Sequence, residues 1–422
     1  MTLEPLAEGY VQLVLAVGRH DGNFVDSYYG PAAWQTAAQE GAPRPLAELR
    51  AGAKQLLAAV SAATPPAAET VRRDYLVGQV TAVEAHLARL DGHRFSFDDE
   101  AEALYQVRPP HTPRAQFDAA LIRLGALLPG PGSVQERYQA ARARVIVPAA
   151  RVDSVFQAAI REARERTRSH ATMPEPDRFS VEYVNDKPWS AYNWYQGSGT
   201  SVIQVNLDLP IAIDRALDLA AHEGYPGHHV YNALLEQEFA VGAPTGRGWV
   251  EFTVYPLFSP QSLIAEGTAN FGIEVAFPGS ERLAFERDVL FPLAGLDPQE
   301  AERWSRIQAE LKLLAFADNE AARGYIDGAL TRAEAEALLV KVSLRTEAQA
   351  AQRMRFVDAY RSYVINYNLG EQLVREWVNR QGGVESEPAR RWAVFVDLIS
   401  SPRLPKALGL THHLHAAKGD GR

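Results

Sequence analysis

The chain has 422 residues, of which 46% are hydrophobic and 23% are charged, and its formal net charge is −9. This composition is typical of a globular protein with a large core, and the acidic balance argues against nucleic acid as a partner. The sequence contains no cysteine, which excludes disulfides and thiolate metal sites. Any metal ligands must therefore be His, Asp or Glu.

The first residues, Met1-Thr2-Leu3-Glu4-Pro5, lack the basic region and apolar run of a secretory signal. No stretch approaches the roughly 20 apolar residues of a membrane span. We therefore expect a cytoplasmic protein that has no membrane partner.

Most of the chain is rich in Ala, Leu, Glu and Arg with helical spacing. Residues 46–63 and 67–90 predict two amphipathic helices, separated by Pro65-Pro66 because proline does not continue a helix. Residues 133–171 predict one or two charged helices, with Pro148 as the divide. The turn-rich segments between these helices predict connectors.

The pattern changes to strands in the middle of the chain. Residues 179–184 and 201–206 alternate in part between apolar and polar side chains, and residues 191–196 are rich in aromatic ones. A helix should follow from Ile211 to about Tyr225, and helices resume after Ser262. The sequence thus predicts a mainly α fold with a small antiparallel sheet (179–206) beside a central helix.

One segment stands out chemically: His222-Glu223-Gly224-Tyr225-Pro226-Gly227-His228-His229 holds three of the eleven histidines. Zinc sites on one helix usually place two histidines four residues apart, but here Pro226 occupies that position. On a regular helix, His229 would sit roughly 10.5 Å from His222, and His228 would face another side. A break at Pro226-Gly227 would bring His228 or His229 back towards His222. The cluster His412, His413 and His415 lies in a polar tail and is expected to be exposed.

The acidic residues near this segment suggest the rest of a metal site. Glu223 follows His222 by about 100° of helical rotation, which suits a general base acting on a metal-activated water. Glu266 in Ala265-Glu266-Gly267-Thr268-Ala269 is the expected third ligand, and Gly267 would let its helix approach the histidine helix. Glu274, two turns further on, could orient a histidine.

The histidine segment resembles the His-Glu-x-x-Pro-Gly-His-His signature of a large bacterial family of unknown function, whose members look like carboxypeptidase Taq metallopeptidases in fold. The segment 265–269 resembles that family's Glu-Gly-Trp-Ala motif, with Thr268 in place of tryptophan. The resemblance implies a large helical bilobal fold, with residues 192–195 and 205–206 in a substrate-binding sheet. It covers about residues 136–274.

The signature contains both later histidines, so it does not choose between them. We favour His228 as the ligand, because Gly227 directly before it frees the backbone. His229 would then stabilise an oxyanion or support the site indirectly.

The leading hypothesis is a zinc-dependent hydrolase, with a metallopeptidase favoured and a carboxypeptidase as one form of it. His222, His228 and Glu266 would bind Zn²⁺ or another divalent transition metal. Glu223 would be the base, and strand 191–196 would align a peptide or small amide substrate. Tyr363 or Tyr367 could stabilise an oxyanion, with Tyr367 taken as the candidate, and Arg361 could bind a terminal carboxylate.

Two alternatives stay open. A non-catalytic scaffold or binding protein could hold a structural metal, although Glu223 would then have no task. A metal-dependent hydrolase of non-peptide amides or esters would use the same residues. For the domains, we expect an N-terminal helical region, 1–132, and a catalytic region, 133–422, in one compact unit.

Overall fold

The computed structural model describes residues 2–240 and 247–409. The tail histidines 412, 413 and 415 lie outside the described residues. The structure is 65% helical and 7% strand, which confirms the predicted mainly α class. None of the described helices combines the length and apolarity needed to cross a lipid bilayer.

The helices before the sheet include those predicted over residues 46–63, 67–90 and 133–171. They are α1 (Glu4–Val17), α2 (Ala32–Gln39), α3 (Leu46–Ala62), α4 (Thr70–Leu90), α5 (Phe97–Tyr105), α6 (Arg114–Leu127), α7 (Val134–Ala143) and α8 (Val152–Arg168). The divide between α7 and α8 contains Pro148, as predicted. Helix α7 begins with a capping box between Ser133 and Glu136, which satisfies backbone donors at its first turn.

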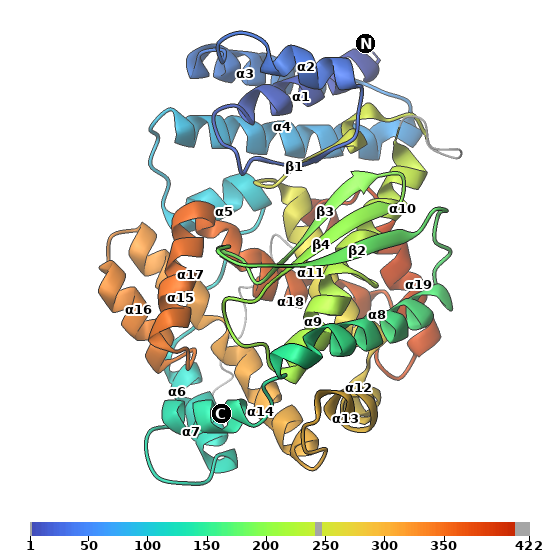
Figure 1. The fold of residues 1–422 in the computed structure, drawn as a ribbon. Helices are drawn as coiled ribbons and strands as arrows, with labels where there is room; N and C mark the ends of the chain where they lie inside the picture. Colours follow the sequence, from blue (N-terminus) through green and yellow to red (C-terminus); the bar gives the residue numbers. More distant parts are fainter. Residues whose placement is uncertain (1, 241–246, 410–422) are drawn as a thin grey trace, which may run out of the picture.

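In Figure 1 the helices after the sheet include α9, α11 and α18 at the centre and the group α15 to α17 on the left. They are α9 (Ile213–Glu223), α10 (His228–Phe239), α11 (Pro260–Ala276), α12 (Gly279–Phe285), α13 (Phe291–Ala294), α14 (Glu300–Leu314), α15 (Ala317–Ile326), α16 (Arg332–Lys341), α17 (Glu347–Tyr360), α18 (Ile365–Arg380) and α19 (Pro388–Ile399).

The predicted strands form a three-stranded sheet of β2 (Arg178–Val184), β3 (Ala191–Gly197) and β4 (Thr200–Asn206). Strand β4 is central, and β3 pairs with it antiparallel as predicted. Strand β2 pairs with β4 in parallel. After β2 the chain continues to the other edge of the sheet, where it forms β3, and then turns back to form β4 between the two. Strand β3 therefore lies at an edge of this sheet.

A second, two-stranded sheet was not predicted. Strand β1 (Val25–Tyr28) pairs antiparallel with β5 (Val254–Pro256). Both strands are too short to show a clear alternation of side chains. A buried ion pair joins the same regions, since Arg72 Nε lies 2.7 Å from Glu251 Oε1. The N-terminal helices are thus tied to the chain near the histidine segment, and the division at residue 132 stays a prediction.

Helix α11 packs closely against α18 at the centre of the molecule (Figure 1). A Cβ atom at Gly267 would lie 2.5 Å from the carbonyl oxygen of Gly370, so this approach requires glycine. The expectation that Gly267 would bring α11 towards the histidine helix is therefore wrong, because Gly267 faces α18. The close contact instead places Tyr367 of α18 beside Asn270 of α11, with 3.0 Å between the Asn270 amide nitrogen and the Tyr367 carbonyl oxygen.

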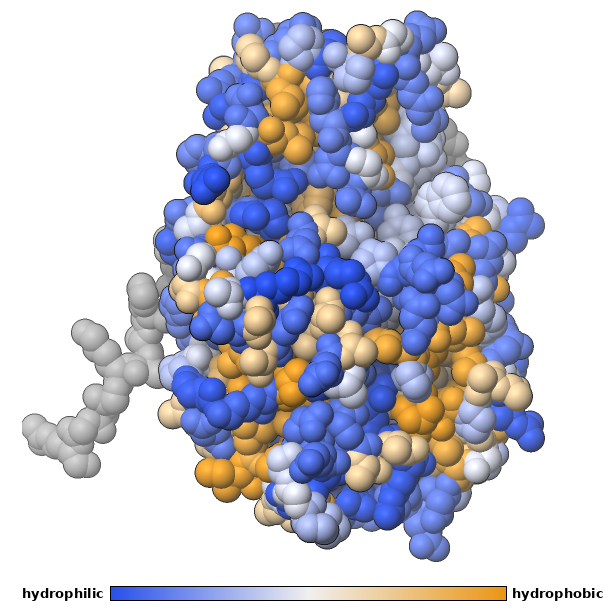
Figure 2. Space-filling model, turned by 60° about the vertical axis from the view of Figure 1, so that its left-hand side comes forward, coloured by the Kyte–Doolittle hydropathy of each residue, from blue (hydrophilic) through white to orange (hydrophobic). Residues whose placement is uncertain are grey.

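A cavity of about 560 Å³ opens between these central elements and the group α15 to α17. Its wall includes residues of β3, α9, α11, α15, α17 and α18. On the face drawn in Figure 2, hydrophobic residues are interspersed among hydrophilic ones.

Candidate metal centre

The histidine segment is divided between two helices. Helix α9 ends at Glu223 and α10 begins at His228, so the predicted interruption between Tyr225 and His228 is present. Gly227 has a negative φ of −79°, so it does not need left-handed backbone. Its role is to leave space, because a Cβ atom there would lie 1.8 Å from the carbonyl oxygen of His222.

This break brings three predicted ligands together. His222 Nε2 and His228 Nε2 are 3.1 Å apart. Glu266 Oε2 lies 3.2 Å from the His222 nitrogen and 3.7 Å from the His228 nitrogen. All three residues line the cavity. A circle through the three atoms has a radius of about 1.9 Å, close to the roughly 2.0–2.2 Å of zinc–nitrogen and zinc–oxygen bonds.

The carboxylate of Glu266 has an oxygen atom whose lone pairs are available to a cation. Glu266 Oε1 accepts a hydrogen bond from the Tyr363 hydroxyl at 2.8 Å, whereas Glu266 Oε2 is buried without a hydrogen-bond donor. Burial raises the pKa of Glu266, but the neighbouring His228 and His222 outweigh it and lower that pKa. Burial lowers the pKa of His228, but Glu266 raises it to about 9.

Asn270 orients His222, a role that the sequence analysis missed. The amide nitrogen of Asn270 donates to the Tyr367 carbonyl, so its oxygen, Oδ1, faces His222 Nδ1 at 3.0 Å. The Nδ1 atom of His222 therefore carries a proton, and the lone pair of Nε2 points at the other two donors. Asn270 follows Glu266 by one helical turn, and this spacing was the available signal. Glu274 was expected to orient a histidine, but it instead pairs with Arg375 at 2.8 Å and with Lys312.

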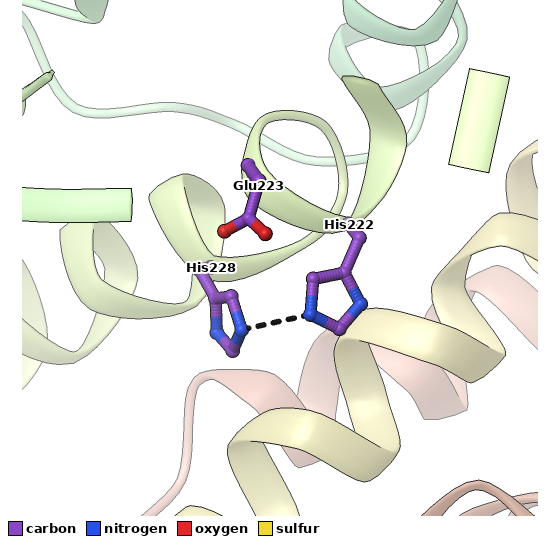
Figure 3. A group of neighbouring side chains, drawn as sticks. All are labelled: His222, Glu223 and His228. Carbon is purple, nitrogen blue, oxygen red and sulfur yellow. Dashed lines mark hydrogen bonds between the residues drawn. The ribbon is translucent and has the colours of Figure 1, made fainter. Parts of the chain in front are cut away.

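Glu223 lies beside the two imidazole rings, as Figure 3 shows. The donor atoms of His222, Glu223 and His228 all lie within 4.8 Å of one another. Glu266 is the better third ligand, because its oxygen is nearer to both ring nitrogens. Burial raises the pKa of Glu223, which makes its carboxylate a stronger base. The Glu223 carbonyl accepts a hydrogen bond from the Asn193 amide at 2.6 Å, which ties it to β3.

The two candidate tyrosines have different surroundings. Tyr363 donates to Glu266 and so holds a predicted ligand. Tyr367 lines the cavity, with its ring centroid 6.4 Å from that of His222. Burial raises the pKa of Tyr367 well above 10, so its hydroxyl keeps the proton that it would donate. Tyr367 remains the candidate for stabilising an oxyanion.

His229 does not belong to this centre. It is fully buried, with Nδ1 2.9 Å from Ser201 Oγ and Nε2 2.9 Å from Asp177 Oδ1. Residues 228 and 229 are neighbours on the first turn of α10 and point about 100° apart, so only one of them faces the cavity. His229 is thus placed away from the cavity, so of its two predicted roles the geometry fits indirect support of the site and not stabilisation of an oxyanion. Its contacts hold the start of α10 against the sheet.

Arg361 was expected to bind a substrate carboxylate, and this is also wrong. Its Nε atom lies 2.6 Å from Glu100 Oε2, and it is not part of the cavity wall. Asp26 was not singled out from the sequence, although it lines the cavity. Burial raises the pKa of Asp26 to about 6, although a hydrogen bond from the Tyr192 hydroxyl lowers it. No local pattern marks it, because β1 reaches the site only through tertiary pairing.

Thr268 stands where the resembling family has tryptophan. Its hydroxyl donates to the Ile264 carbonyl at 2.7 Å within α11. The side chain is 1% exposed, so the smaller residue is packed inside the helix bundle. The replacement leaves Glu266 in position.

The network around His229 makes a prediction about stability. Burial raises the pKa of Asp177, but hydrogen bonds from His229, Tyr225 and Arg168 outweigh it and lower that pKa below its usual 3.8. Asp177→Asn should therefore reduce the free energy of unfolding at pH 7 by about 2–4 kcal/mol. The stabilisation requires the carboxylate, so the difference from wild type should shrink as pH falls below about 4.

Urea unfolding between pH 3 and pH 7 measures this difference. The exposed Asp186→Asn provides the control, with a change within about 0.5 kcal/mol at every pH, because asparagine also adopts the left-handed backbone of Asp186. A loss in Asp177→Asn that is independent of pH would contradict the assigned charge state.

Comparison with known proteins adds information on the fold. Neither a family model nor a curated protein matches the sequence. The structure is similar to that of a "putative lipoprotein" from Colwellia psychrerythraea, with a TM-score of 0.51 and 18% identity over 85% of this chain. This chain covers 65% of the length of that one. A "putative lipoprotein of unknown function" from Shewanella oneidensis has a TM-score of 0.47 and 13% identity, over 89% of this chain and 75% of that one. The Colwellia protein thus shares the fold, but a sequence identity of 18% gives no information on function.

Proposed function

We propose that this protein is a metal-dependent hydrolase, with zinc as the expected ion, that cleaves peptide bonds. One observation carries the proposal: His222 Nε2, His228 Nε2 and Glu266 Oε2 converge at the wall of a cavity, with the carboxylate of Glu223 beside them. Three protein ligands with an open side are typical of catalytic zinc, whereas structural zinc usually has four.

Each side chain has a defined task in this proposal. A divalent metal held by His222, His228 and Glu266 would lower the pKa of a water and polarise the substrate carbonyl. Glu223 takes a proton from that water and passes it to the leaving amine. The hydroxyl adds to the carbonyl carbon, and the carbon–nitrogen bond breaks. Tyr367 donates a hydrogen bond to the developing oxyanion.

Strand β3 is placed to align the substrate. It is an edge strand, and Ala191, Tyr192 and Asn193 line the cavity. An extended peptide could therefore add to this edge through backbone hydrogen bonds. Asn193 Oδ1 is buried without a hydrogen-bond partner, so it offers an acceptor at the same place.

A metal-dependent hydrolase of non-peptide amides or esters is the second candidate, because the same atoms would act on any polarised carbonyl. A non-catalytic metal protein is less well supported, since it leaves the buried base Glu223 without a task.

The test is metal analysis of the purified protein, followed by digestion of a peptide mixture read by mass spectrometry. We expect close to one metal ion per chain and new peptide termini that disappear with a chelator. Metal without peptide cleavage, but with cleavage of simple amides or esters, would favour the second candidate. Metal without any hydrolysis would favour the scaffold.

A further inference from the structure

One acidic side chain of the cavity wall has no task in the proposed hydrolysis. It is Asp26 of β1. The pairing of β1 with β5 is irregular between Val25 and Ser27, whose partners are adjacent residues of β5. Asp26 is thus an extra residue between two paired ones, which is the arrangement of a β-bulge. Bulges redirect a side chain out of the regular alternation of a strand, and they are frequent beside active sites.

The carboxylate of Asp26 is only partly used by the protein. Its Oδ1 atom accepts a hydrogen bond from the Tyr192 hydroxyl at 2.8 Å. In the described parts of the chain no lysine, arginine or histidine forms an ion pair with it, and the charged groups that act on it are His228, Glu266 and Glu223. A divalent metal at the candidate centre would balance the two glutamates. The negative charge of Asp26 is then left for a cationic group of a ligand.

Aromatic rings lie around this carboxylate. Tyr192, Tyr255 and Tyr360 line the same cavity. Burial raises the pKa of Tyr255 and of Tyr360, and the negative charge of Asp26 raises both further, so these groups are near one another. The phenol rings are therefore neutral at physiological pH. Because the face of an aromatic ring attracts a cation, a carboxylate among such rings can bind an ammonium group through both charge and contact.

Strand β3 connects this position with the candidate metal centre. Tyr192 holds Asp26, and the next residue, Asn193, donates to the Glu223 carbonyl at 2.6 Å. Asp26 and the metal ligands also line one cavity. A peptide that lies along β3 with its scissile carbonyl at the metal centre would therefore bring a neighbouring group to Asp26.

We propose that Asp26, with the rings of Tyr255 and Tyr360, binds a primary ammonium group of the substrate. The hydrolase would then prefer peptides with a positive charge near the scissile bond. The inference rests on the proposed hydrolase function and names its substrate class. The ammonium belongs either to the free N-terminus of the peptide or to a lysine side chain, which share this chemistry. Tyr192 is a positioning residue, because it holds one carboxylate oxygen and leaves the other to the ligand.

Matched peptides test the ammonium site. The reference peptide is acetylated and contains norleucine, a second has the same sequence with a free N-terminus, and a third series is acetylated and carries lysine at successive positions. We expect the wild-type kcat/KM to be about 10–10²-fold higher for a charged peptide than for the reference. A preference for the free N-terminus assigns the site to the α-ammonium, and a preference for one lysine position assigns it to the side chain. Equal rates throughout would overturn the proposal.

Substitutions then locate the effect at Asp26. Asp26→Asn can still accept the Tyr192 hydrogen bond but has no charge, so most of the preference for the charged peptide should disappear. Asp26→Glu keeps the charge and should retain part of the preference. The matched control is Asp297→Asn, which is exposed and absent from the cavity wall and should keep the wild-type preference. An equal fall for charged and neutral peptides in Asp26→Asn would indicate a structural role and overturn the proposal.

A binding measurement separates this inference from the proposed function, because its ligands contain no bond to hydrolyse. Calorimetry on the zinc-loaded protein compares n-pentylamine with 1-pentanol, which has the same chain without the charge. We expect the amine to bind at least about tenfold more tightly, and Asp26→Asn to lose this difference. A difference that persists in Asp26→Asn would overturn the ammonium site.

The two proposals can therefore fail separately. Tighter binding of the amine through Asp26, without any peptide cleavage, would support the ammonium site and overturn the peptidase proposal. Peptide cleavage with equal binding of the amine and the alcohol would support the peptidase and overturn the ammonium site.

Discussion

Glu223→Gln should keep the bound metal and lose turnover by about 10²–10⁴-fold, which is the usual contribution of a placed general base. The amide cannot accept a proton from water, but it fills the same space beside His222 and His228. Because burial raises the pKa of Glu223, the charged carboxylate is unfavourable to the fold at neutral pH. The variant should therefore be at least as stable as the wild type when both lack metal.

Metal content, initial rates and urea unfolding of both proteins test this expectation. The exposed Glu182→Gln is the control and should keep wild-type activity. Loss of metal from Glu223→Gln would make Glu223 a ligand rather than a base. Normal activity on a confirmed substrate would remove it from the chemistry altogether.

His222→Ala should abolish stoichiometric metal binding, because it removes the nitrogen that lies within 3.2 Å of both other donor atoms. Hydrolysis should fall to background with it. Asn270→Ala should have a graded effect, since losing the partner that orients a ligating histidine typically weakens metal affinity by about 10–100-fold. Metal analysis after dialysis against a weak chelator measures both variants.

The control for this series is His170→Ala, because His170 is exposed and stacks on Trp392 outside the cavity. It should retain close to one ion per chain. If His222→Ala also retains its metal, the site at the end of α9 is wrongly assigned. Wild-type affinity in Asn270→Ala would leave His222 as a ligand and contradict only the inferred tautomer.

The boundaries of several helices and strands were predictable, since they depend on neighbouring residues, whereas α10 was not predicted because helices were expected to resume only after Ser262. The alternation in residues 179–184 and 201–206 predicted β2 and β4 to within a residue or two. The break after Glu223 was predictable because Pro226 cannot continue a regular helix and the histidine spacing fails on one. Strands β1 and β5 were not, because their pairing joins segments more than 200 residues apart.

The composition of the candidate centre was likewise present in the sequence, whereas its division of roles required the tertiary structure. The residue types around Pro226-Gly227 identified His222, Glu223 and one of the two later histidines as a chemical group, with Glu266 as the expected third ligand. Whether His228 or His229 faces the cavity was decided by Asp177 and Ser201, which bury His229 from the other side.

The residues that the sequence left unmarked share one physical property. Asp26 and Asn270 each reach the cavity through packing between elements that are distant along the chain. Local sequence determines the periodicity, capping and breaks of a helix, because these depend on residues within a turn or two. It does not determine which faces of separate helices meet. The roles of Asn270 as the partner of His222 and of Asp26 in the cavity wall therefore became visible only in the folded chain.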